Sequence, residues 1–221
     1  MSKYIHDSDH TVYINSKGEE VPSATTVLKM LNKPALVKWA NFLGFNRQNV
    51  DDVLNEYAER GTLIHELISS YLHGDLIVYI DDNRFDPLMV LKFFNCFKVW
   101  YQQHTIEPIL LEKSFCSDKF GGTVDFYGKI DGVYTLLDFK TAKKIRLSMI
   151  LQLALYVVLL EQNGYIIEQV GILLVNPGHK NEKYISRKDI EQYIIFAEKL
   201  VDMFHLHYTL VTTNKWDNEI Y

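Results

Sequence analysis

Two aspartates and a lysine stand inside a stretch that otherwise alternates like a pair of β-strands. The stretch reads GGTVDFYGKIDGVYTLLDFKTAK, from Gly121 to Lys143, and it holds Asp125, Asp138 and Lys140. Two carboxylates brought together can bind a hard divalent cation such as Mg²⁺ or Mn²⁺. A lysine cannot bind that cation, but it can hold a phosphate or an attacking water beside it. These residue types indicate metal-assisted chemistry on a phosphate ester.

A tight turn sets the register of the two strands. The Asp131-Gly132 pair favours a two-residue type I′ loop. Counting back along both strands from this loop pairs Asp125 with Asp138, with Cβ atoms roughly 5 Å apart on one face. Lys140 shares that face because strand side chains repeat every second residue. Like charges directly opposite one another are destabilising, so we expect full solvation, a shared proton or a bound cation to offset the repulsion.

An exposed hairpin with merely solvated charges is the simplest alternative, since charged residues are common on edge strands. Two features favour a site instead. Ser148, Gln152 and Tyr156 form a polar stripe on an otherwise apolar helix, and a buried helix keeps such a stripe where it meets partners or a wet cleft. In RGTLIHE, Gly61 lies one turn before His65, whose neutral imidazole is an apt third metal ligand.

The elements that must position these residues follow from the hydrophobic pattern. It predicts an extended hairpin up to about residue 20, helices over 25–31, 34–44, 50–72, 86–104, 145–162 and 187–208, and strands over 107–115, 121–130, 133–140 and 166–175. Gly61 weakens the prediction of an unbroken helix over 50–72. We expect one α/β (α+β) domain over residues 1–221, with a central mixed β-sheet flanked by helices. Within it, residues 1–105 form an N-terminal hairpin and helical region, and residues 106–221 form the core.

Composition restricts the class of protein. The 221 residues are 48% hydrophobic and carry a net charge of −5, which argues against a uniformly basic nucleic-acid coat but leaves room for a local basic strip. No apolar run is long enough for a membrane span, and the first residues lack the apolar core of a signal peptide, so we expect no membrane partner and a cytoplasmic location. Cys96 and Cys116 are too few for a disulfide framework or an iron–sulfur cluster.

The chain resembles the PD-(D/E)XK nuclease superfamily, in its RecB-like exonuclease branch. The matching residues, in order, are His65 in GTLIH, Asp125 in GGTVDF, Asp138 and Lys140 in DFK, and Gln152 and Tyr156 in QLALY. Upstream, VPSATTVL and KPALVKWA resemble the corresponding segment of phage nucleases and of the mitochondrial genome maintenance exonuclease. The superfamily's Pro-Asp is Val-Asp here, which leaves the carboxylate in place. The four cysteines that bind an iron–sulfur cluster in some members of the branch are absent.

The resemblance implies a restriction-endonuclease-like αβββαβ core and a role for each matching residue. His65, Asp125, Asp138 and the main-chain carbonyl of Phe139 would bind Mg²⁺ or Mn²⁺. Lys140 would orient the water nucleophile or stabilise charge in the transition state. The remaining two, Gln152 and Tyr156, would shape the site and contact the DNA backbone. Glu112, on the strand before the hairpin, is a possible auxiliary ligand, although an ordinary edge-strand charge explains it at least as well.

Further candidates for DNA binding lie outside these motifs. Lys143, Lys144 and Arg146 follow the catalytic strand and could track phosphates, or form an ordinary basic loop. Trp39 could stack on a single-stranded base or belong to the core, and Ser23 either contacts DNA in the segment that resembles phage nucleases or caps a helix. The HDSDH run near the start is more typical of a solvated tail than of a metal site.

The function expected from the sequence is hydrolysis of phosphodiester bonds in DNA by a Mg²⁺- or Mn²⁺-dependent exonuclease. Single-stranded or frayed DNA ends are the expected substrate, in phage-type replication or recombination, which would place the protein in the host cytoplasm and beside other replication or recombination proteins. A structure-specific endonuclease and a non-catalytic DNA-binding module on the same fold are the alternatives.

Overall fold

The computed structural model describes residues 4–7, 10–31, 34–75, 85–178 and 181–213. Its central element is a five-stranded sheet in the order β4 (Ile106–Cys116), β5 (Gly121–Ile130), β6 (Val133–Lys140), β7 (Gln169–Leu174) and β8 (Asn181–Ser186). Neighbouring strands are antiparallel except β6 and β7, which run parallel. The expected mixed sheet is therefore present.

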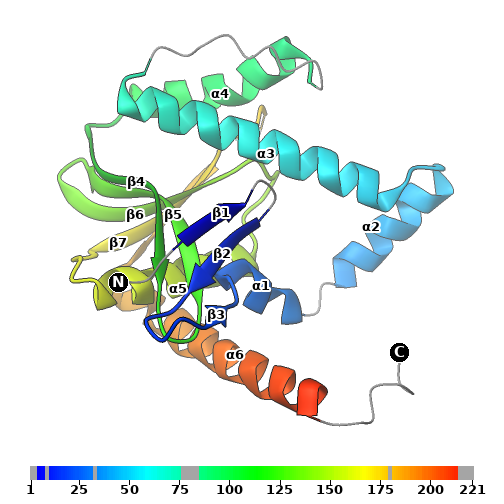
Figure 1. The fold of residues 1–221 in the computed structure, drawn as a ribbon. Coiled ribbons are helices and arrows are strands. Elements are labelled where there is room, and N and C mark those ends of the chain that lie inside the picture. Colours follow the sequence, from blue (N-terminus) through cyan, green and yellow to red (C-terminus); the bar gives the residue numbers. More distant parts are fainter. Residues whose placement is uncertain (1–3, 8–9, 32–33, 76–84, 179–180, 214–221) are drawn as a thin grey trace.

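Helices cover both faces of this sheet (Figure 1). On one face, α5 (Leu147–Gln162) and α6 (Arg187–Thr213) contribute most of a buried apolar cluster. On the other, α3 (Val50–His73) and α4 (Pro87–Tyr101) supply most of a second cluster. Because α5 connects the parallel pair β6 and β7, the chain from α4 to β7 has the expected order αβββαβ.

The N-terminal part is tied to the central sheet by its backbone. A small antiparallel sheet of β1 (Tyr4–Asp7), β2 (His10–Ile14) and β3 (Glu20–Val21) precedes α1 (Ala24–Val27), a 3₁₀ turn η1 (Leu28–Met30) and α2 (Pro34–Phe45). Gly121 N–H donates to the carbonyl of Pro22 at 3.0 Å, which places the start of α1 beside the first residue of β5. Within the HDSDH run, His6 and Asp7 end β1 and His10 begins β2, and the remaining two residues lie outside the described residues.

The structure confirms the predicted helix over 50–72 and adds two strands that were not predicted. Helix α3 runs unbroken through Gly61, where an added Cβ would lie 3.8 Å from Thr141 Oγ1. The glycine costs the helix about 1 kcal/mol relative to alanine, and packing of the apolar face of α3 offsets it. Strands β1 and β8 were not predicted, because short edge strands gain their stability from pairing rather than from their own pattern.

The hairpin of β5 and β6 confirms the expected turn and most of the expected register. Asp131 and Gly132 have φ values of 51° and 84°, as a type I′ turn requires. Five pairs follow from the turn to Phe126 and Leu137.

Among the described residues, no helix is both long and apolar enough to cross a bilayer.

Candidate active site

The expected pairing of Asp125 with Asp138 is where the structure departs from a simple hairpin. The ladder between β5 and β6 ends one pair earlier, at Phe126 and Leu137. Instead of facing Asp138 across a regular pair, the Asp125 carboxylate turns to the backbone, and its Oδ2 accepts a hydrogen bond from Phe139 N–H at 2.9 Å. The repulsion between the two aspartates is reduced because one of them is fixed by this amide.

The second aspartate is buried with its oxygens unsatisfied. Asp138 is 1% exposed, and neither carboxylate oxygen accepts a hydrogen bond of good geometry. Among the described residues, its one ion pair is with Lys140 Nζ, 2.7 Å from Oδ2. A buried carboxylate without hydrogen bonds costs free energy unless a cation compensates it. The Asp138 side chain is therefore built to face a positive charge, of which Lys140 supplies one.

The imidazole of His65 comes to the same place from α3. Its Nδ1 lies 3.5 Å from Asp125 Oδ2 and 3.9 Å from Glu112 Oε1. Among the described residues, His65, Glu112 and Asp125 each place one ligand atom within 4.8 Å of the other two. This spacing is suited to a single metal ion. Glu112, which the sequence left as a possible auxiliary, is thus at the site, in a left-handed backbone conformation with φ 46°.

These groups shift one another's pKa values. Burial lowers the pKa of His65, but Asp125 overrides this and raises it to about 9. Burial, with help from Asp125, raises the pKa of Glu112 to about 7. Burial also raises the pKa of Asp138 to about 6, against the opposing effect of Lys140. Burial opposes ionisation of Asp125 too, yet His65 and Lys140 hold its pKa below the ordinary value.

The shifts predict how the stability of the metal-free protein varies with pH. The raised pKa values of His65, Glu112 and Asp138 each add stability that is complete below the ordinary value and is lost as pH rises through about 9, 7 and 6 respectively. The lowered pKa of Asp125 adds stability that is lost only as pH falls through its acidic range. In EDTA, we therefore expect Tm to fall from pH 5 to pH 9.

Divalent metal should reverse that trend, since a metal ion binds ionised carboxylates and neutral imidazole. The measurement is Tm in EDTA and in Mn²⁺ at each pH. The stabilisation by Mn²⁺ should grow as pH rises, and a Mn²⁺ effect that stays constant across this range would contradict the assignment of these groups as ligands.

Gln152 and Tyr156 lie together on α5, with Tyr156 close enough to Asp138 and Asp125 to be affected by their charge. Gln152 Nε2 donates to Tyr156 Oη at 2.7 Å, and the tyrosine ring is buried. Burial and the nearby aspartates raise the pKa of Tyr156 far above its ordinary range, so the hydroxyl stays neutral. The ring lies on Gly122, where an added Cβ would be 2.4 Å from Tyr156 Cε1. The need for glycine here was missed, because GGT in the sequence does not show what packs on it.

The residues expected to contact DNA fall in three places. Lys143, Lys144 and Arg146 are exposed in the loop between β6 and α5. Trp39 is partly buried on α2, its ring 6.4 Å from that of Tyr57, so the two proposed roles for it are compatible. Ser23 caps α1, accepting a hydrogen bond from Thr26 N–H at 3.0 Å, as the capping alternative predicted.

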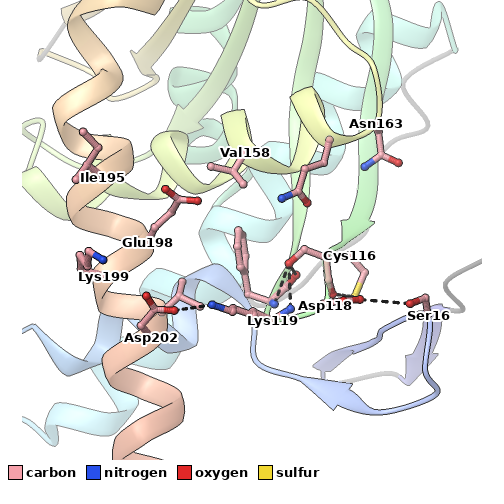
Figure 2. A pocket seen from close by; sticks show the side chains of 14 residues that line it. Ser16, Cys116, Asp118, Lys119, Val158, Asn163, Ile195, Glu198, Lys199 and Asp202 are labelled. Atoms are coloured by element: carbon pink, nitrogen blue, oxygen red, sulfur yellow. Dashed lines mark hydrogen bonds and ion pairs between the residues drawn. The ribbon is translucent and has the colours of Figure 1, made fainter.

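A separate cavity of about 790 Å³ lies between the β4–β5 turn, α5 and α6 (Figure 2). Lys119 and Asp202 form an ion pair across it at 2.6 Å, and Ser16 donates to Asp118 at its far side. None of the residues predicted for the site lines this cavity. Its size alone does not make it the reactive centre.

The donor set fits a hard divalent cation. One imidazole and two carboxylates, from His65, Glu112 and Asp125, place their ligand atoms close together. Asp138 lies outside this group, but its buried oxygens accept no hydrogen bond. Oxygen-rich sets of this kind suit Mg²⁺ and Mn²⁺. Phe139, whose carbonyl the resemblance implies as a ligand, lies between Asp138 and Lys140 and holds Asp125 through its amide.

Comparison with known proteins adds little to this geometry. No protein family profile matches the chain, and no curated protein matches it. One solved structure similar to it is described as the crystal structure of SSO0001, with 15% sequence identity and a TM-score of 0.30. That match covers 54% of this chain and 62% of the other, less than two thirds of its length. A likeness this low indicates neither a family nor an activity.

Proposed function

We propose that the protein is a metal-dependent DNA nuclease of the PD-(D/E)XK superfamily, in its RecB-like branch. One observation carries the proposal: the buried, unsatisfied carboxylate of Asp138, paired with Lys140 at the end of β6. Asp125 and His65 lie in contact nearby, and the αβββαβ order of elements supports the same assignment.

Each side chain has a task that follows from its position. His65, Glu112, Asp125 and Asp138 would hold Mg²⁺ or Mn²⁺, which when bound polarises the scissile phosphate and lowers the pKa of a water. Lys140 keeps a positive charge at the site, because the carboxylates around it raise its pKa despite burial. Its ammonium can hydrogen-bond the attacking water or a phosphate oxygen where negative charge develops.

The environment of Asp125 explains how it remains ionised. It accepts the Phe139 amide and faces the imidazole of His65, so it stays an acceptor throughout the pH range in which the site works. The neutral hydroxyl of Tyr156, oriented by Gln152, can donate to an oxygen of the sugar–phosphate backbone.

The substrate proposed is DNA with a single-stranded or frayed end, and the reaction is exonucleolytic. The decisive experiment incubates the protein with end-labelled linear and circular DNA, single- and double-stranded, with Mg²⁺, Mn²⁺ or EDTA. Release of nucleotides from linear single strands with metal, and none in EDTA, is the expected result.

Other outcomes separate the alternatives. Cleavage of circular single strands, which have no ends, would show that the protein is an endonuclease rather than an exonuclease. Tight DNA binding that is indifferent to metal, with no cleavage under any condition, would leave a binding module in place of an enzyme.

A further inference from the structure

One lysine on the unpredicted strand β8 lies in register with the buried aspartate of the site. Asp138 on β6 pairs with Ile172 on β7, and Ile172 pairs with Lys183 on β8. Residues paired in this way project from the same face of a sheet. Two strand spacings of about 4.8 Å separate the backbones, so Lys183 lies about 10 Å from Asp138 along one cross-strand row.

Lys183 and Asp138 share the face of the sheet that α5 and α6 cover. Ile172, the middle member of the row, belongs to the apolar cluster beneath α5 and α6. The neighbouring Glu182 alternates to the opposite face, where its carboxylate accepts a hydrogen bond from Trp100 Nε1 on α4 at 2.6 Å. Glu182 also lines the cavity that contains Lys183, but its carboxylate is hydrogen-bonded to Trp100.

Other cations gather at the same place. Lys144, Arg146 and Lys183 line one cavity of about 450 Å³, together with Glu182 and the apolar residues Ile145, Leu147 and Ile150. No ion pair is formed by these three cations within the described residues. The cavity also adjoins the first turn of α5, a helix that begins without a side-chain cap, so its first N–H groups add to the positive potential.

We propose that this basic pocket, formed by Lys144, Arg146 and Lys183, binds a backbone phosphate of the DNA strand within a few nucleotides of the bond that is cut. The inference rests on the proposed function and adds to it a path for the substrate: across the start of α5 to the β8 edge of the sheet. Lys183 has no counterpart among the residues predicted to contact DNA, because β8 itself was not predicted.

The test compares two lysines that differ in place but not in charge. Lys183→Ala removes a cation from the pocket, whereas Lys188→Ala removes an exposed cation from the first turn of α6, outside it. Affinity for a fluorescent single-stranded oligonucleotide is measured over a salt series with Mg²⁺, each variant being made in an Asp138→Asn background to suppress cleavage.

Losing one phosphate contact has a defined signature. Lys183→Ala should weaken binding roughly 5- to 10-fold regardless of sequence and reduce the slope of log affinity against log salt by about 0.7 to 1. Lys188→Ala should change neither quantity. Both residues are exposed, so equal Tm values are expected and serve as the check on folding.

A neutral methylphosphonate placed at each position in turn locates the contact. At one position near the end of the oligonucleotide, the methylphosphonate should weaken binding by the protein that retains Lys183. It should not weaken binding by the Lys183→Ala variant any further. If Lys183→Ala and Lys188→Ala have the same affinity and the same salt slope, the proposal of a phosphate pocket is wrong, even if the unmodified protein cuts DNA. If the salt slope of binding depends on Lys183 but the protein cuts no DNA, the pocket proposal stands and the nuclease proposal fails. If the protein neither binds nor cuts DNA, both proposals fail.

Discussion

Asp138→Asn is expected to abolish metal-dependent cleavage while making the metal-free protein more stable. Asparagine keeps the shape but loses the charge that a divalent cation requires, so the rate should fall about 10²- to 10³-fold or more. The same change removes a buried carboxylate whose ionisation is unfavourable, as its raised pKa of about 6 shows. At pH 8 in EDTA, Tm should therefore rise, by about 2–4 °C for each kcal/mol recovered.

The matched control is Asp75→Asn, an exposed carboxylate beyond the end of α3. It should leave both cleavage and Tm unchanged. A gain in Tm with full loss of activity distinguishes a charge held for function from one held for stability. Retention of cleavage by Asp138→Asn would refute the assignment of Asp138 as a ligand.

Gly122→Ala is expected to damage stability and activity together. The added Cβ would lie 2.4 Å from Tyr156 Cε1, so the buried ring must move. Overpacking of this kind costs about 1–3 kcal/mol and should lower Tm by several degrees. Displacement of Tyr156 also breaks its contact with Gln152, so cleavage should fall roughly tenfold or more.

Gly44→Ala provides the control, since an added Cβ there meets nothing within 4 Å and the residue is inside α2. Its Tm should stay the same or rise slightly, because alanine favours helix. Thermal unfolding and single-turnover cleavage of the two variants are compared with those of the unmodified protein. If Gly122→Ala matched Gly44→Ala in both, Tyr156 would not depend on the glycine.

Several features of the site could be predicted because they depend on local rules. The Asp131-Gly132 turn specifies the hairpin register, and that register brought Asp125 and Asp138 to one end of the sheet. The stripe of Gln152 and Tyr156 needed only helical spacing. In each case a short sequence determines the geometry without reference to distant residues.

Other features depend on contacts that local patterns do not contain. The Asp125 carboxylate binds the amide of Phe139 instead of standing in a regular pair, which requires the end of the ladder to open. Glu112 reaches His65 only because of a backbone conformation that its sequence context does not reveal. Strand β8, and with it Lys183, exists through pairing with β7.

The backbone of Glu112 has a consequence for how this protein balances durability against activity. Its φ of 46° belongs to the left-handed region, where a Cβ costs about 1–2 kcal/mol and glycine would rest without strain. The irregular geometry leaves Glu112 and Asp125 outside the ladder of β4 and β5, although their neighbours on both sides pair. The strained backbone at this one strand position keeps the Glu112 carboxylate near His65. Selection for thermal stability alone would therefore favour glycine there, and the site would lose that carboxylate.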